Sequence, residues 1–138
     1  MKRLFLSFAV LLGPLLLKAQ DFPLGKSQEE IRRFRATPPH SALNIFQSDT
    51  CDRYKLGDLT QENYYYQNSV CYKSKQTYSL MPNEEMSQSI ELMQQILNDK
   101  FKKVKENDWT NADGSEKIEL SILKDKNQYV VEIISVPR

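Results

Sequence analysis

The sequence predicts an α+β domain: a mostly antiparallel sheet of about five to six strands with two helices packed on one face. Residues 41–80 alternate with period two and are rich in tyrosine and β-branched residues, which is typical of strands. Residues 27–36 and 82–104 show helical periodicity instead. The expected order is therefore one helix, three or four strands, a second helix and two final strands. Short turns between strands favour antiparallel pairing.

The chain begins with the pattern of a secretory signal peptide. Met1–Arg3 is basic, Leu4–Leu17 is an apolar run, and Lys18-Ala19-Gln20 offers a small residue before a cleavage site. The run is 14 residues long, whereas a membrane-spanning helix needs about 18 or more, so an uncleaved anchor is the less favoured alternative. We therefore expect residues 1–19 to be removed and residues 20–138 to form a single periplasmic or secreted domain with no membrane span.

The predicted cleavage changes the charge of the protein. The full chain of 138 residues has 19 basic and 18 acidic side chains. Residues 1–19 include Lys2, Arg3 and Lys18 but no acidic residue, so 16 basic and 18 acidic side chains remain and the net charge becomes −2. A slightly acidic domain has no overall attraction to phosphate backbones or anionic membranes. We therefore expect no nucleic-acid partner.

The first predicted helix begins with a capping box. Ser27 and Glu30 have the spacing at which each side chain accepts a hydrogen bond from the other's backbone N–H. Ile31 and Phe34 form the inward stripe, and the helix ends before Pro38-Pro39, which cannot continue it. Because a helix of about ten residues is marginal alone, this stripe is expected to pack on a sheet.

Three or four strands are expected between the two helices, from four candidate segments. A hairpin turn over Gln67–Ser69 joins the last two of them. The predicted strands are Leu43–Gln47, Arg53–Leu56, Asn63–Tyr66 and Val70–Leu80.

The second helix has the clearest pattern in the predicted domain. Pro82–Glu85 opens it with acidic side chains, which the helix dipole favours at this end. Apolar residues then recur at intervals of three and four, namely Met86, Ile90, Met93, Leu97 and Phe101. After a loop that contains Trp109, two alternating segments over 117–122 and 128–136 predict a terminal hairpin.

Cys51 and Cys71 are the two cysteines of the chain. In an oxidising compartment such a pair is most simply a disulfide, and two reduced, buried cysteines are the alternative. A catalytic thiol would need an activating base, for which His40 is the one available histidine. One histidine and two cysteines exclude multi-histidine and four-cysteine metal sites, and we expect no metal and no cofactor.

Six of the seven tyrosines lie within residues 54–78, in the strands predicted between the two helices. Successive residues of a strand face opposite sides, so Tyr65 cannot share a face with Tyr64 and Tyr66. Exposed aromatic side chains on a sheet can stack on sugars or anchor a protein interface, whereas ordinary strand composition is the alternative explanation. The candidate binding residues are Tyr54, Tyr64, Tyr65, Tyr66, Tyr72 and Tyr78.

Residues 22–31, with the sequence FPLGKSQEEI directly after a leader ending in KAQ, resemble the start of small exported proteins of unknown function common in Bacteroidetes. In many of these a short helix is followed by a tyrosine-rich hairpin with a cysteine, here Tyr64–Cys71. A long helix then precedes a lone tryptophan, here Trp109. The resemblance implies a periplasmic or secreted α+β domain and brings no catalytic residues.

The sequence contains no glycine-rich phosphate loop, nucleophile elbow or HExxH motif. We therefore expect an exported, non-enzymatic binding or accessory domain that recognises an envelope protein or a glycan through its sheet. The alternative is a small hydrolase or thiol enzyme that uses Cys71 or Cys51 with His40.

Overall fold

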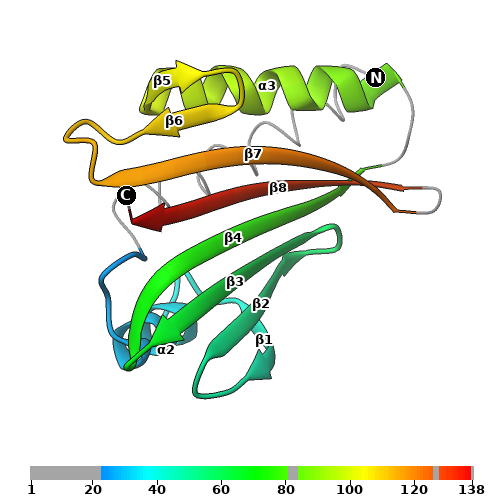
Figure 1. The fold of residues 1–138 in the computed structure, drawn as a ribbon. Coiled ribbons are helices and arrows are strands. Elements are labelled where there is room, and N and C mark those ends of the chain that lie inside the picture. The colour runs from blue at the N-terminus through cyan, green and yellow to red at the C-terminus, as the bar shows by residue number, and fades with distance from the viewer. Residues whose placement is uncertain (1–22, 81–83, 126–127, 138) are drawn as a thin grey trace.

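One antiparallel sheet runs through the whole α+β molecule (Figure 1). The computed structural model describes residues 23–80, 84–125 and 128–137, so the predicted signal peptide lies outside the described residues. Eight strands follow the spatial order β1-β2-β3-β4-β8-β7-β6-β5. The elements are α2 (Gln28–Ala36), β1 (Leu43–Gln47), β2 (Cys51–Gly57), β3 (Thr60–Gln67), β4 (Val70–Leu80), α3 (Glu84–Lys100), β5 (Lys102–Lys105), β6 (Asp108–Thr110), β7 (Glu116–Asp125) and β8 (Gln128–Pro137).

The element order repeats along the chain. A helix followed by four antiparallel strands occurs first as α2 with β1–β4 and again as α3 with β5–β8. The last strands of the two halves, β4 and β8, pair with each other at the centre of the sheet. The first strands, β1 and β5, therefore form its two edges.

The predicted fold, a sheet of about five to six strands with two helices on one face and the order helix, three or four strands, helix, two strands, is wrong. The sheet has eight strands, and four of them follow the second helix. The error arises at residues 101–110, where the helical pattern was extended through Val104. Instead α3 ends at Lys100, and two short strands of four and three residues follow. Asn107, with a φ of 60°, lies in the turn between them.

Local signals at the start of the domain are confirmed. The backbone N–H of Glu30 donates to Ser27 Oγ at 3.2 Å, and the N–H of Ser27 donates to Glu30 Oε2 at 2.8 Å, which completes the predicted capping box. The hairpin turn between β3 and β4 is also confirmed. Asn68 and Ser69 both have positive φ there, as a two-residue type I′ turn requires.

Each helix packs on its own half of the sheet. Met93 and Leu97 of α3 are fully buried in a core that includes Trp109, Ile118 and Val131. Ile31 of α2 is buried in a smaller core with side chains of β2–β4. These are Tyr54, Tyr64, Tyr66 and Cys71. The residues that alternate with these core side chains project from the opposite face of the sheet.

Candidate binding surface

Most of the predicted tyrosine surface lies in the interior. Tyr54, Tyr64, Tyr66 and Tyr78 are all at most 4% exposed and belong to the two cores. Tyr65 is half-buried and Tyr72 is exposed. Of the six candidate tyrosines, only these two therefore offer aromatic surface to a partner.

A buried ion pair connects α2 to the sheet beneath these tyrosines. Arg35 Nη2 lies 2.5 Å from Glu62 Oε2, and both side chains are only 3% exposed. Arg35 Nε donates to the hydroxyl of Tyr64 at 2.8 Å. Burial raises the pKa of Glu62 and the Arg35 guanidinium opposes that rise. A charge at this depth is tolerated because its partner and further donors accompany it.

A second pair lies one turn earlier in α2. Arg32 donates through Nε to Asp52 Oδ2 at 2.9 Å and through Nη2 to Asp52 Oδ1 at 3.0 Å, which is bidentate geometry. The hydroxyl of Tyr66 also donates to Asp52 Oδ2, at 2.9 Å. The Asp52 side chain is fully buried, so we assign this pair to positioning the helix rather than to ligand contact.

The face of the sheet opposite these pairs carries aromatic and basic side chains. Phe46 of β1 lies opposite Arg53 of β2, and Tyr65 of β3 lies opposite Lys73 of β4. The guanidinium carbon of Arg53 is 5.7 Å from the Phe46 ring centroid, and Lys73 Nζ is 5.2 Å from the Tyr65 ring centroid. Both distances fit cation–π contacts. Arg53 Nε also donates to Asn63 Oδ1 at 3.1 Å.

This face of the first half is basic. Together with Lys55 and Lys75, which the strand register places on the same face, these residues form what we call the basic platform. Two of its cations have acidic neighbours: Lys75 lies 3.4 Å from Glu132 and Lys55 lies 3.9 Å from Asp58. Among the described residues, no ion pair is made by the other two. The platform comprises Phe46, Arg53, Lys55, Tyr65, Lys73 and Lys75.

The same face of the second half is balanced in charge. Lys117 of β7 lies 3.8 Å from Asp108 and 3.4 Å from Glu119. Lys105 of β5 lies 3.9 Å from Asp108. An anionic ligand would therefore meet competing carboxylates here, whereas on the basic platform it would meet two cations that make no ion pair within the described part of the chain.

The predicted disulfide is absent, because both cysteines are free. The register explains why. Cys51 pairs with Tyr65 on the open face, whereas Cys71 pairs with Tyr66 on the face that holds the core. Strand β3 also separates the two strands that carry them. The two sulfurs therefore project from opposite faces of the sheet.

The thiols also lack the electrostatics of a nucleophile. Burial raises the pKa of Cys71 to about 11 and raises that of Cys51 as well, whereas reactive thiols have lowered pKa values. Cys71 Sγ donates to the carbonyl of Lys73 at 3.4 Å. The ring of His40 stacks on Phe34 of α2 at 4.4 Å between centroids. These features give no support to a thiol enzyme.

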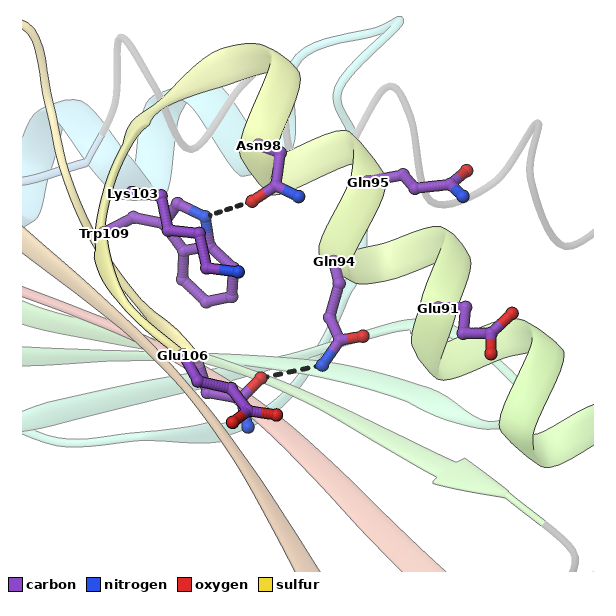
Figure 2. Close-up of a pocket in the computed structure, with 8 residues that line it drawn as sticks. Glu91, Gln94, Gln95, Asn98, Lys103, Glu106 and Trp109 are labelled. Carbon is purple, nitrogen blue, oxygen red and sulfur yellow. Dashed lines mark hydrogen bonds between the residues drawn. The ribbon is translucent and has the colours of Figure 1, made fainter.

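A polar pocket of about 290 Å³ lies between α3 and the β5–β6 turn (Figure 2). Three of its four amide side chains already bond within the protein: Gln94 Nε2 donates to Asn107 Oδ1 at 2.8 Å, and Trp109 Nε1 donates to Asn98 Oδ1 at 2.9 Å. Trp109 is buried, so its ring offers no face for stacking. We therefore rank this pocket below the basic platform. Its lining residues are Glu91, Gln94, Gln95, Asn98, Lys103, Glu106, Asn107 and Trp109.

In residues 23–80, 84–125 and 128–137, no group of three or more histidine, cysteine, aspartate or glutamate residues could hold a metal ion. No helix there is long and apolar enough to cross a membrane.

Comparison of the chain with protein-family models, with curated proteins and with solved structures found no significant match.

Proposed function

We propose that this protein is an exported, non-enzymatic binding domain whose basic platform recognises an acidic region of an envelope protein. The leader pattern over residues 1–19 supports export. The observation that carries the proposed recognition is the pair of cations, Arg53 and Lys73, which are held on aromatic rings and make no ion pair among the described residues.

The geometry of Arg53 suits it to this role. Its contact with the Phe46 ring and its hydrogen bond to Asn63 already fix the side chain. Binding a partner would therefore cost little further side-chain entropy. A guanidinium has five N–H donors in a rigid fork that matches a carboxylate. In the described part of the chain, only the Nε donor of Arg53 is engaged. The two terminal nitrogens are therefore available for a bidentate contact.

A protein partner fits the surface better than nucleic acid does. The predicted mature chain has a net charge of −2, which opposes the general attraction to polyanions on which nucleic-acid affinity depends. The platform is local and carries two aromatic side chains, and aromatic and arginine residues are enriched in protein interfaces.

Charge reversal on the purified mature chain tests this proposal. The probe is fluorescein-labelled poly-L-glutamate, followed by fluorescence anisotropy at low and at physiological salt. The double variant Arg53→Glu with Lys73→Glu is expected to weaken binding by about tenfold or more, because the cations are replaced by repelling charges. The matched control, Lys102→Glu with Lys103→Glu, reverses two exposed lysines of β5 and is expected to change binding little.

Equal losses in the two double variants would show only nonspecific attraction and would contradict the proposal. Unlabelled dextran sulfate, added as a competitor, tests whether the partner is an anionic glycan instead of an acidic protein region. If it displaces poly-L-glutamate at much lower charge-equivalent concentrations, the partner is an anionic glycan and not an acidic protein region.

A further inference from the structure

The two edges of the sheet differ in chemistry. Strand β1, with the sequence LNIFQ, has no charged residue, and Leu43, Ile45 and Phe46 are 65%, 44% and 48% exposed. Strand β5, with the sequence KKVK, carries three lysines. Edge strands present unpaired backbone groups, and lysines on an edge discourage pairing with another chain. The lysines of β5 therefore discourage pairing of that edge with another strand, whereas β1 has no charged side chain that would do so.

We infer that β1 accepts an extended segment of a partner protein as a ninth strand of the sheet, and that this segment alternates apolar and acidic residues. Its acidic character rests on the proposed function, whereas the strand addition rests on the edge itself. Backbone hydrogen bonds supply affinity in such additions, and alternate side chains supply specificity.

The position of Arg53 explains the choice of an acidic segment. The cation–π contact draws its guanidinium from β2 over the Phe46 ring on the edge strand. A neighbouring strand lies about 4.8 Å away in a sheet. A glutamate beside Phe46 on an added strand would therefore come within reach of this guanidinium. Leu43 pairs with Lys55 and lies on the same face as Phe46, so the next acidic residue of the added strand, two positions along, would lie beside Leu43.

Irregularity in β1 limits the length of the added strand. The register shifts between Asn44 and Phe46, and Asn44 Nδ2 donates to the Phe46 carbonyl at 3.1 Å and to the Arg53 carbonyl at 3.4 Å. A bulge twists the edge and interrupts regular pairing. A segment of about five residues, the length of β1, is therefore expected rather than a long strand.

A second copy of this chain fits the edge less well. Two β1 strands paired across a two-fold axis would bring both Arg53 guanidinium groups, each over its own Phe46, to the same joint. Like charges placed together at an interface oppose association. An acidic segment of another protein would instead complement both the apolar side chains of β1 and the positive charge of Arg53.

The test uses an isotope-labelled mature chain and the peptide acetyl-Val-Glu-Val-Glu-Val-amide, with NMR detection of binding and of amide exchange. We expect slowed exchange at β1 amides, and about tenfold weaker binding in the variant Leu43→Gln with Ile45→Gln. The matched control Val104→Gln, at an exposed position of the other edge, should bind normally. A peptide N-methylated at every residue keeps its side chains but has no residue N–H left on either edge, so it cannot pair as a strand and should not bind.

The outcomes separate this inference from the proposed function. If charge reversal of the basic platform abolishes binding while N-methylation and the β1 variant have no effect, strand addition is wrong and the platform stands. If a Val-Gln-Val-Gln-Val peptide binds as well as the acidic one and still needs β1, strand addition stands and acidic recognition is wrong. Absence of any β1 response at millimolar peptide overturns the inference. So does a dimer that the β1 variant converts to a monomer.

Discussion

The two halves of this molecule share an element order but differ in what fills the interior. The α3 half has an apolar core in which Met93, Leu97 and Trp109 pack against β7 and β8. The α2 half places two arginine–carboxylate pairs between its helix and its strands. Helix α2 has 9 residues and α3 has 17. The shorter helix buries less apolar surface, and directional ion pairs take a larger part in holding it.

Strand pairing and one covering helix are therefore enough to define each half. The side chains under the helix can be either apolar or paired charges. Apolar burial stabilises in proportion to area and is not directional. Buried ion pairs fix an orientation but contribute little net stability relative to apolar residues of similar shape. We infer that the two ion pairs under α2 fix the position of β2 and β3. They therefore also position the basic platform on the other face of these strands.

The largest expected effect is in the polar half. Arg35→Met should reduce the free energy of unfolding by about 3–5 kcal/mol, because Glu62 would remain buried without its partner. The double variant Arg35→Met with Glu62→Met should recover most of the loss, since it removes both charges. Denaturant unfolding measures both. A single variant that loses less than about 1 kcal/mol would contradict a role for this pair in the stability of the half.

A cavity in the apolar core of the α3 half should lower the free energy of unfolding slightly less than Arg35→Met does. Leu97→Ala is expected to lower the free energy of unfolding by about 3 kcal/mol, because Leu97 is fully buried and its removal leaves a void. Leu123→Ala removes the same atoms from an exposed position of β7 and should change stability by less than about 0.5 kcal/mol. Similar losses at the two positions would be inconsistent with the core described for α3.

Loss of the helix cap should have a smaller effect. Ser27→Ala removes the acceptor for the Glu30 N–H and should cost about 1 kcal/mol. Ser27→Thr keeps the hydroxyl and should restore most of it, and Ser41→Ala, in an exposed loop, serves as the control. An unchanged unfolding midpoint in the first variant would mean that α2 does not depend on its capping box.

The smallest expected effect concerns a carboxyl in the second half that has no cation among the described residues. Burial, with a smaller contribution from Asp113, raises the pKa of Glu116 to about 7 from its ordinary value of 4.5. Because folding favours the protonated form, the stabilising contribution of Glu116 is full below pH 4.5 and is lost as pH rises to about 7. Glu116→Gln should remove this dependence, so its melting temperature should exceed that of the wild type at pH 8 and match it at pH 4.

The exposed neighbour Glu119 provides the control for this prediction. Glu119→Gln should leave the difference in melting temperature between pH 4 and pH 8 unchanged. If Glu116→Gln and the wild type show the same pH dependence, the carboxyl is ionised in the folded protein without penalty.

Part of this structure could be predicted from local sequence. The capping box and the turn after Gln67 were predicted because each depends on a few adjacent residues. The buried acids could also have been found. Asp52 and Glu62 alternate in phase with Tyr54 and Tyr64, and Arg35 follows Ile31 by four residues on the inward stripe of α2. That combination signals charges that pair beneath a helix.

Other features depend on distant pairing and left no local pattern. Strands β5 and β6 have four and three residues, too few to establish an alternation. The pairing of β5 with β6 and of β6 with β7 overrides the helical pattern. The shift between Tyr65 and Tyr66 against β4 leaves Tyr72 unpaired and turns Cys71 into the core. A strict alternation would have placed Cys71 on the open face, so no reading of spacing could have assigned its side.

An NMR titration of residues 20–138, the predicted mature chain, with poly-L-glutamate tests the central claim most directly, because it compares the two halves in one experiment. The account predicts chemical-shift changes concentrated at Arg53, Tyr65 and Lys73 and along β1, with the α3 half nearly unchanged. Changes centred on Gln94 and Trp109, or spread evenly over the exposed lysines of both halves, would contradict it.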